Sequence, residues 1–409
     1  MNTRPVSLLI VDDDPVFAEV LGQMVRFLGA DFPCVSQWVD CAESAMEALQ
    51  RSTCDLVLLD YHLPGADGLQ LLAHIRSLPE PQPAVIMLTG SGSEEVAVEA
   101  MKRGARDYLC KANLDVAPLL RSLRSALAQK RLADEVALYM AQTRADLQMA
   151  RQLQQSLLPD SYPAFPRSAP AAESALRFCH RFCPAAELAG DFFSVFPLAD
   201  TRAGVFMCDV MGHGVRSALV TAMVRALVDS AAPVALEPGH FMAEMNARLT
   251  GLLKSVGGPM FATACFLTAD IDTGILCFAT AGHPPPLHLR RRAGETAPLR
   301  LPPAAGPALG LFPEAVYATG ECLLAEGDVI LLFTDGLFEV ASPEGDDEYG
   351  MERLLAAARQ RMHLEPPELC DALIAEVQAF AEGAPFSDDV CLLSMEVARL
   401  HAAPDQATL

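Results

Sequence analysis

Short runs of apolar residues recur through the first 118 residues, and stretches of helical periodicity separate them. The apolar runs lie at 7–11, 34–39, 55–60, 84–89 and 107–110. The amphipathic stretches between them include 15–28, 42–50, 69–78 and 94–103. Strands that alternate with helices are typical of a parallel sheet with helices on both faces. We therefore predict an α/β fold for this segment: a doubly wound, parallel, five-stranded sheet.

A stretch with neither proline nor glycine follows, between Pro118 and Pro159. Its residues are mostly good helix formers, so they predict one helix roughly 60 Å long at about 1.5 Å per residue. The helix carries a weak heptad seam at Val136, Met140, Thr143, Leu147, Ala150 and Leu157. This seam is equally compatible with a parallel coiled-coil homodimer and with a helix docked on one domain.

A proline-rich boundary at 160–174 separates this helix from a segment with a different pattern. Strand-like runs lie at 203–210, 261–271, 274–281, 328–334 and 389–397. Helical stretches lie at 215–232, 238–255, 350–362 and 366–382. Runs of strands with grouped helices favour an α+β fold, here an antiparallel β-sandwich flanked by helices. We expect one domain at 1–125, a second at 172–398, and a helical linker at 119–160.

Composition narrows the possible partners and the compartment. The net charge of the 409 residues is −22, so the chain lacks the clustered positive charge that nucleic-acid binding needs. No apolar stretch approaches the ~20 residues that span a bilayer, and the N-terminus does not resemble a signal peptide. Twelve cysteines scattered through apolar runs favour reduced thiols in a cytoplasmic protein. Cys179 and Cys183 flank His180, and we interpret them as core strand residues, because a zinc site would need more ligands.

Polar residues mark the C-terminal ends of the predicted parallel strands, where such sheets bind ligands. Asp12 and Asp13 follow the first run, Asp60 ends the third, Thr89 ends the fourth, and Lys111 follows the fifth. Acids in this arrangement hold Mg²⁺, which bridges an aspartate and an incoming phosphoryl group. The lysine supplies fixed positive charge, and the hydroxyl can bond a phosphoryl oxygen. The pattern predicts a phosphorylatable Asp60, with Mg²⁺ ligands from Asp12, Asp13, Asp60 and the backbone carbonyl of His62.

These motifs, over residues 6 to about 125, resemble the receiver domain of bacterial two-component response regulators. The resemblance implies that Asp60 takes a phosphoryl group from a sensor histidine kinase and that Thr89 moves toward it. It also implies that Tyr108, three residues before the lysine, is the aromatic switch that turns inward. One departure is Ala112, which replaces the usual proline after the lysine. No group with a chemical role is missing.

Four further acidic motifs lie at strand edges downstream: LAGDFFSVF, MCDVMGHG, LFTDGLFEV and FSDDVCLL. Hydrolysis of a phosphate monoester needs an activated water and neutralisation of phosphate charge. Two divalent ions about 3.5–4 Å apart can provide both, and Mg²⁺ or Mn²⁺ favours oxygen ligands. Aspartates from several strands suit this chemistry, so the motifs predict a site for two Mn²⁺ or Mg²⁺ ions. The candidate ligands are Asp191, Asp209, Asp335 and Asp388.

The four motifs resemble those of the PPM-type (protein phosphatase 2C-like) phosphatases, in the branch named after sporulation stage II protein E (SpoIIE). The resemblance covers about 172–398, includes MFATACF and TAGHPPPL, and is preceded by ARQLQQSLLP. It implies that Asp209 bridges the two metals and that the carbonyl of Val210 joins one of them. The further ligands that it implies are Asp191, Asp335 and Asp388, with possible support from Asp389 and His213. Departures are Ala189, Ser194 and Met211, which stand where the family more often has glycine, an acid and a small residue.

Together the two resemblances imply a response regulator in which phosphorylation of Asp60 controls a metal-dependent serine/threonine protein phosphatase. In this branch the substrate is typically a phosphorylated STAS-domain anti-anti-sigma factor, a partner that the resemblance alone implies. The alternative is a phosphatase-like adaptor that binds a regulatory protein without turnover, against which the retained metal aspartates argue. The sequence leaves open the sign of control, the physiological metal, the identity of the kinase and substrate, and the oligomeric state.

Overall fold

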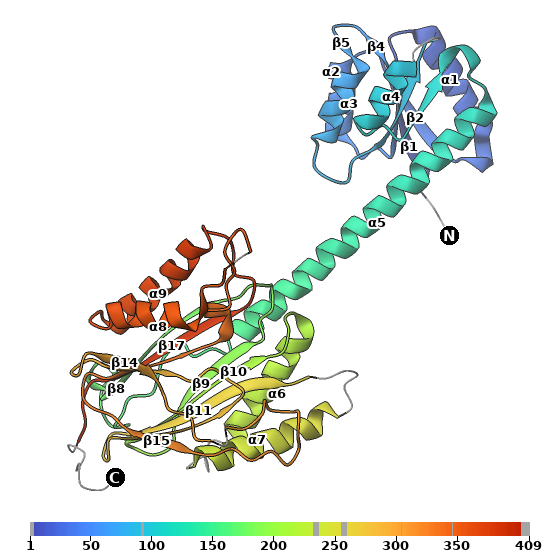
Figure 1. Ribbon diagram of the computed structural model, residues 1–409. Helices are drawn as coiled ribbons and strands as arrows, with labels where there is room; N and C mark the ends of the chain where they lie inside the picture. Colours follow the sequence, from blue (N-terminus) through green and yellow to red (C-terminus); the bar gives the residue numbers. More distant parts are fainter. Residues whose placement is uncertain are drawn as a thin grey trace. The chain divides into compact units, whose positions relative to one another are not determined.

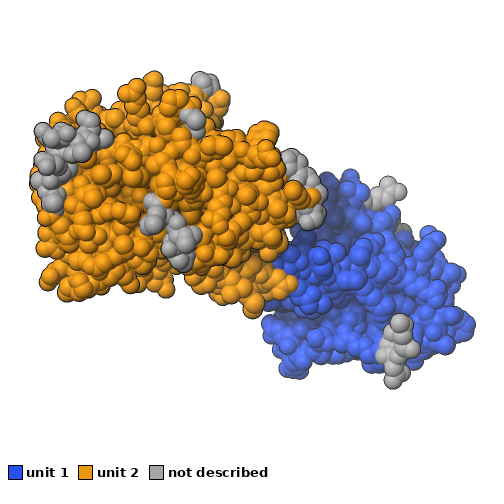
Figure 2. All heavy atoms as spheres, turned by 90° about the horizontal axis from the view of Figure 1, so that it is seen from below, with its two compact units in different colours: residues 1–144 blue, residues 145–409 orange. Residues whose placement is uncertain are grey.

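The computed structural model describes residues 4–90, 94–231, 237–254, 260–303, 305–345 and 347–401. The chain divides into two compact units, residues 1–144 and 145–409 (Figure 2). Each unit has hydrophobic cores of its own. Within the described part of the chain, no helix combines the length and the hydropathy needed to cross a membrane.

Unit 1 is built on a five-stranded sheet whose strand pairs are all parallel (Figure 1). The strand order is β2-β1-β3-β6-β7. From β1 the chain adds β2 on one side and then adds β3, β6 and β7 in turn on the other side. A short antiparallel pair, β4 (His62–Leu63) with β5 (Ala66–Asp67), lies outside this sheet. The five strands are β1 (Val6–Val11), β2 (Cys34–Val39), β3 (Leu56–Asp60), β6 (Ala84–Thr89) and β7 (Asp107–Cys110).

Helices cover both faces of this sheet because alternate residues of its strands point to opposite sides. Leu8, Ile10 and Leu58 pack with helices α1 and α5 on one face. Leu9 and Val57 pack with helices α2, α3 and α4 on the other face. The helices are α1 (Pro15–Leu28), α2 (Ala42–Arg51), α3 (Gly68–Arg76), α4 (Glu94–Lys102) and α5 (Val116–Gln155). The predicted doubly wound, parallel, five-stranded fold is confirmed.

Helix α5 is a single helix of 40 residues that continues across the boundary between the two units. Pro118 lies in its first turn, where a missing backbone N–H costs no hydrogen bond. Its first third contributes Leu119 and Leu123 to the core of unit 1. Further along, Val136 and Met140 are exposed at 45% and 65%. Whether these seam positions pair with a second copy stays a prediction.

Unit 2 contains two five-stranded sheets whose strands pair antiparallel. The first sheet has the order β15-β12-β11-β10-β9, and the second has the order β14-β13-β16-β17-β8. Strands of the first are β9 (Asp191–Pro197), β10 (Arg202–Val210), β11 (Ala262–Asp270), β12 (Ile275–Ala281) and β15 (Gly320–Leu323). Strands of the second are β8 (Leu176–Cys183), β13 (Leu287–Arg290), β14 (Glu295–Pro298), β16 (Val329–Phe333) and β17 (Val390–Val397).

Unit 2 has four layers, a pair of helices, two sheets and a second pair of helices, and a hydrophobic core lies between each layer and the next (Figure 1). The inner faces of the two sheets enclose the central core. Helices α6 (Val215–Ala231) and α7 (Pro238–Leu253) cover the first sheet, and α8 (Gly350–Arg361) and α9 (Pro366–Phe380) cover the second. The antiparallel β-sandwich flanked by helices is confirmed.

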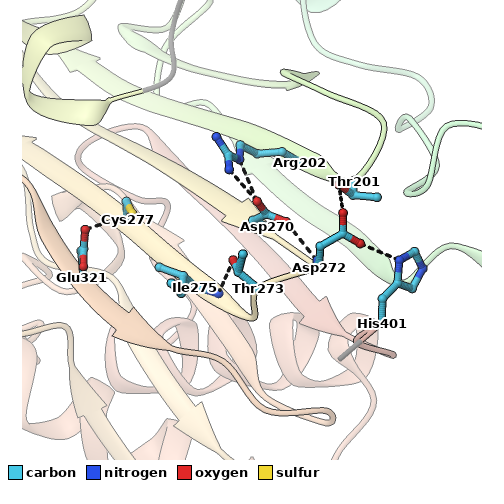
Figure 3. A network of polar contacts seen from close by, with 9 residues as sticks. All are labelled: Thr201, Arg202, Asp270, Asp272, Thr273, Ile275, Cys277, Glu321 and His401. Carbon is cyan, nitrogen blue, oxygen red and sulfur yellow. Dashed lines mark hydrogen bonds and ion pairs between the residues drawn. The ribbon is translucent and has the colours of Figure 1, made fainter. Parts of the chain in front are cut away.

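A polar network fastens the segment after β17 to the first sheet (Figure 3). Arg202 donates two hydrogen bonds to Oδ2 of Asp270, at 3.1 and 2.6 Å. Oδ1 of Asp270 accepts from the backbone N–H of Asp272 at 3.0 Å. Asp272 in turn accepts from the Thr201 hydroxyl at 2.8 Å and contacts Nδ1 of His401 at 2.7 Å. Residue 401 is thus anchored at the β11–β12 turn.

The unfolding of unit 1 can be followed selectively because Trp38, the only tryptophan, lies on β2. Leu58 is fully buried in the core between the sheet and α1. We predict that Leu58→Ala lowers the free energy of unfolding of unit 1 by about 2–5 kcal/mol, because it leaves a cavity. Urea denaturation of the full chain, followed by Trp38 fluorescence, measures this change. The control Phe27→Ala, at a side chain 80% exposed, should shift it by less than about 0.5 kcal/mol.

Candidate functional site

The sequence-predicted residues of unit 1 come together at the C-terminal edge of its sheet. Asp12 follows β1, Asp60 ends β3, Thr89 ends β6 and Lys111 follows β7. The Lys111 ammonium lies 2.7 Å from Oδ2 of Asp12 and 2.8 Å from Oδ2 of Asp60. It also lies 4.7 Å from the centre of the Phe17 ring. One ammonium is therefore shared between two carboxylates that are almost wholly buried.

The pKa values of Asp60 and Lys111 are set by burial and by neighbouring charges, which act partly in opposite directions. Burial raises the pKa of Asp60, the nearby Lys111 lowers it, and the charge of Asp12 raises it, with a net upward shift. Burial alone would lower the pKa of Lys111, but the bonds and charges of Asp12 and Asp60 raise it overall. The ammonium thus stays charged at neutral pH and remains paired with both acids.

The three acids of unit 1 are close enough to share a cation. Asp12, Asp13 and Asp60 can each offer an oxygen so that all three oxygens lie within 4.8 Å of one another. Carboxylate oxygens at this spacing fit a hard ion such as Mg²⁺. His62, whose carbonyl is a further candidate ligand, lies on β4 two residues beyond Asp60. Tyr108, on β7, is 46% exposed.

Two residues that the sequence analysis missed position the Asp60 loop. Gly68 opens α3 so close to β3 that a Cβ there would lie 2.2 Å from the carbonyl oxygen of Asp60, and its N–H donates to the carbonyl of Tyr61 at 2.7 Å. Only glycine permits this approach. Trp38 donates from Nε1 to the carbonyl of Asp12 at 2.9 Å. The pair Asp67-Gly68 at the start of a predicted helix could have indicated the role of the glycine. No local sequence pattern indicates the contact of Trp38 with Asp12.

In unit 2 the predicted acids gather from both sheets. Asp191 opens β9 and faces Asp209 of β10 in the strand register. Asp335 begins a 3₁₀ turn, η5 (Asp335–Leu337), just after β16. Asp388 lies just before β17, the strand that pairs with β16. Two strand ends from each sheet therefore bring these acids to one edge of the sandwich.

The acids of unit 2 repel one another, and this repulsion adds to the effect of burial in raising their pKa values. Burial raises the pKa of Asp209 to about 7, and its strongest charged neighbours are all carboxylates, Asp335 first among them. Asp191 is fully buried, and its pKa lies well above the usual range because of burial and then the charge of Asp209. Burial and the charge of Asp388 also raise the pKa of Asp335. Such a concentration of uncompensated acids suits bound cations.

The oxygen spacing differs between the two candidate metal sites. Among the described residues, the acids of unit 2 do not offer three oxygens within 4.8 Å of one another, as Asp12, Asp13 and Asp60 do. The donor set is nonetheless all oxygen, with carboxylates from both sheets and the carbonyl of Val210 at the end of β10. Oxygen donors spread over a wider edge fit two hard ions better than one.

Asp389 holds the loop before β9, and His213 lies near it. The carboxylate of Asp389 is buried and accepts hydrogen bonds from the N–H groups of Ala185 and Gly190, at 2.8 and 2.7 Å. Both of its oxygens are therefore occupied by the loop. Burial raises the pKa of Asp389. The hydrogen bonds from Gly190 and Ala185 lower it, and so does the charge of His213. Both residues are thus placed where they can support the acids.

Close backbone approach explains the glycines of these motifs. A Cβ at Gly190 would lie 2.5 Å from the carbonyl oxygen of Val210, and one at Gly336 would lie 2.2 Å from that of Asp389. Gly212 and Gly214 have φ values of 79° and 94°, which other residues rarely adopt. These glycines therefore permit the tight turns and the close approach of the strand ends at this site.

Thr334 and Gln154 contact this site, and the sequence analysis missed both. The Thr334 hydroxyl donates to Oδ2 of Asp191 at 2.6 Å and accepts from the N–H of Cys391 at 2.9 Å. Gln154, in the last turn of α5, forms two hydrogen bonds with the backbone of Ala189, at 2.6 and 2.9 Å. Thr334 precedes the TDG aspartate, which was a usable signal. Gln154 is one of three glutamines in four residues, so its contact could not be singled out.

Comparison with known proteins matches both parts of the chain. Residues 8–124 match the family of response regulator receiver domains, and residues 199–398 match the family of stage II sporulation protein E (SpoIIE). The phosphoserine phosphatase RsbP of Bacillus subtilis is 25% identical over 258 residues, which cover 62% of this chain and 58% of RsbP. The response regulator protein FleR of Pseudomonas aeruginosa is 40% identical over 105 residues, which cover 26% of this chain and 21% of FleR.

A solved structure shares the fold of unit 2. The SiaA-PP2C domain of Pseudomonas aeruginosa has a TM-score of 0.54 and 24% identity, over 64% of this chain and 99% of that domain. The fold and the acidic sites thus define a receiver joined to a PP2C-type domain. Each match describes one part of the chain: residues 8–124 form a response regulator receiver domain, and residues 199–398 match the SpoIIE family. It spans no more than about three fifths of the length of the two curated relatives.

The raised pKa of Asp209 predicts a pH-dependent cost of folding in the metal-free chain. Below about pH 4 the carboxyl is protonated in both the folded and the unfolded chain, so it has no effect. As the pH rises toward about 7, only the unfolded chain ionises, and stability falls. We predict that Asp209→Asn stabilises the metal-free unit 2 at pH 8 by at most about 4 kcal/mol, and has little effect at pH 4.

Calorimetric unfolding of the full chain in a metal chelator, at both pH values, measures this difference. Asp270→Asn is the matched control, because Asp270 is also buried but is paired with Arg202. Its substitution should destabilise the chain at pH 8. Equal destabilisation by Asp209→Asn at both pH values would show that the carboxylate carries no charge penalty.

Proposed function

We propose that this protein is a response regulator in which phosphorylation of Asp60 controls a metal-dependent phosphatase that acts on phosphoserine or phosphothreonine in another protein. The observation that carries the proposal is the convergence of Asp191, Asp209 and Asp335 at one sandwich edge, with pKa values raised by burial and mutual repulsion. We assign residues 1–125 to the receiver, 119–160 to a helical linker and 172–398 to the phosphatase domain.

In the receiver, Asp60 accepts the phosphoryl group from a sensor histidine kinase. A Mg²⁺ ion held by the acids and by the carbonyl of His62 would supply positive charge to the incoming group. The Lys111 ammonium lies 2.8 Å from Asp60, so it can form an ion pair with an oxygen of the bound phosphoryl group. The hydroxyl of Thr89 lies at the end of the neighbouring strand and can bond the phosphoryl group once it forms. Tyr108 is the switch residue that we expect to turn inward.

In the phosphatase domain, the four aspartates and the Val210 carbonyl would hold two Mn²⁺ or Mg²⁺ ions, which lower the pKa of a bound water and neutralise phosphate charge. Asp209, at the end of β10, is the bridging ligand in this assignment. Thr334 fixes the orientation of Asp191 through its 2.6 Å hydrogen bond. Asp389 fixes the loop that leads into β9, and we assign a supporting role to His213, whose charge acts on Asp389.

The names of two relatives support the proposed substrate class. RsbP carries the name phosphoserine phosphatase, and so does RsbU of Bacillus subtilis, which is 25% identical over 49% of this chain. We propose a phosphoprotein substrate of the same kind, and by family resemblance a STAS-domain antagonist of an anti-sigma factor. We further propose a cytoplasmic location, in keeping with twelve free thiols.

The contact of Gln154 with Ala189 provides a physical route for control. Ala189 lies two residues before Asp191, and Gln154 holds both its N–H and its carbonyl. Any rotation or shift of the last turn of α5 therefore acts on the backbone of the metal-binding loop. We propose that the receiver uses this helix to reposition the loop, alone or through a homodimer in which the seam of α5 pairs.

The deciding experiment is hydrolysis of p-nitrophenyl phosphate by the full chain with Mn²⁺ or Mg²⁺. We expect turnover that needs the metal and that Asp209→Asn lowers by more than about a hundredfold, because a ligand is lost. Asp229→Asn, an exposed acid paired with Arg225, is the matched control and should retain the rate. Beryllofluoride, a phosphoryl mimic, should change the rate, and Asp60→Asn should abolish that change.

Each outcome decides between the two candidate functions. Metal-dependent turnover that Asp209→Asn abolishes supports the enzyme, and the direction of the beryllofluoride effect gives the sign of control. A folded chain without turnover, with and without beryllofluoride, would contradict the phosphatase and favour the adaptor that binds a regulatory protein.

A further inference from the structure

Two cysteines meet where helix α9 packs on strand β8, on the outer face of the second sheet. Cys179 lies on β8 and Cys370 lies on α9. Helix α9 packs on β8 so that Cys370 and Cys179 are close enough to shift each other's pKa. Cys370 is fully buried and Cys179 is half-buried. Only one sulfur of the pair is therefore open to a reagent from solvent.

A third residue confirms how the pair is arranged. Ser394 of β17 faces Cys179 in the strand register, and its hydroxyl donates to the Cys179 carbonyl at 3.1 Å. The same serine is also a hydrogen-bond partner of the Cys370 thiol. Cys370 thus sits directly over the place where β8 and β17 pair, against both Cys179 and Ser394.

Arg181 holds the cysteines in place and supplies positive charge. Arg181 and Cys179 are two residues apart on β8, so their side chains point to the same face of the sheet. Arg181 donates from Nη1 to the Cys179 sulfur at 3.2 Å. It also donates two hydrogen bonds to Asp371, the neighbour of Cys370, at 2.5 and 2.7 Å. One guanidinium therefore ties β8 to α9 and contacts the exposed sulfur.

The two thiols differ in acidity. The hydrogen bond from Cys370 lowers the pKa of Cys179 below its usual range, and Arg181 lowers it further, against the effect of burial. The bond to Cys179 and burial raise the pKa of Cys370. Burial instead raises the pKa values of Cys34, Cys183 and Cys277, which are also half-buried. The thiolate is the reactive form of cysteine, so Cys179 differs in reactivity from these three.

We propose that Cys179 and Cys370 are an oxidative modification site, at which a hydroperoxide converts the thiol pair into an intramolecular disulfide. The site lies on the α9 side of the second sheet, and the proposal is independent of the phosphatase activity. It rests on the packing of α9 on β8, which brings Cys370 beside Cys179, and on the Arg181 guanidinium, which contacts both the accessible sulfur and the neighbour of Cys370.

The reaction balances with the hydroperoxide as the only oxidant. The Cys179 thiolate attacks one peroxide oxygen, the O–O bond breaks, and hydroxide leaves with a proton as water, which forms a sulfenic acid. The Cys370 sulfur then attacks the Cys179 sulfur, the S–O bond breaks, and the Cys370 proton leaves with the oxygen as a second water. Two thiols are oxidised, and one peroxide is reduced. A thiol reductant reverses the product by exchange.

Peroxide treatment of the reduced full chain tests this proposal. The protein is oxidised, its remaining thiols are blocked with N-ethylmaleimide under denaturing conditions, and the digest is analysed by mass spectrometry. We expect a disulfide-linked peptide that joins Cys179 to Cys370 and that disappears on addition of dithiothreitol. Arg181→Gln should slow its formation by about three- to tenfold, because the thiolate fraction falls more than the intrinsic nucleophilicity rises.

Single substitutions separate this site from general oxidation. Cys370→Ser removes the resolving thiol, so Cys179 should instead accumulate a sulfenic acid that dimedone traps. Cys34→Ser, at a half-buried thiol of raised pKa, should leave the rate of linkage unchanged. Oxidation of other cysteines without the linked peptide, or of Cys179 directly to a sulfinic acid in the unsubstituted chain, would overturn the proposal.

Discussion

Mutual repulsion among buried carboxylates is the constraint on which both sites of this protein depend. The two units solve it differently. In unit 1 the ammonium of Lys111 lies within 2.8 Å of both Asp12 and Asp60, so it offsets part of their charge from inside the fold. In unit 2 the strongest charged neighbours of Asp209 are other acids, and its pKa rises to about 7. Both sites retain negative charge that suits bound cations, and the acids of the second site retain more of it.

The backbone must hold the acids of unit 2 together against this repulsion. Gly190 and Gly336 let strand ends approach until a Cβ would clash with a carbonyl oxygen. Thr334 binds Asp191, and Asp389 uses both of its oxygens on the loop before β9. The unfavourable charge at this edge is thus offset by the three buried cores elsewhere in unit 2.

The sequence predicted most of the fold because the central strands are uninterrupted apolar runs. Strands β3 and β6 of unit 1 are buried at every position and were easy to recognise. The predicted strand runs did not include β8, β9 or β13–β15, although the motif at Asp191 was placed at a strand edge. Strand β9 begins with that acid, while β14 is four residues long and mostly exposed. The acids of both sites were predicted from motif order. The contacts of Gln154 and Trp38 were not, because they depend on tertiary packing and no local pattern encodes them.

The difference in charge balance bears on how one site could govern the other. Phosphorylation of Asp60 would add negative charge beside Lys111, which already serves two acids, so the lysine has to redistribute its contacts. Among the described residues, the strongest charged neighbours of Asp209 are acids, so this site depends more on where its loop is held. Gln154 fixes that loop through the backbone of Ala189, and it does so from the last turn of α5. In the proposed route of control, a change in that turn would act on the spacing of acids that already repel one another.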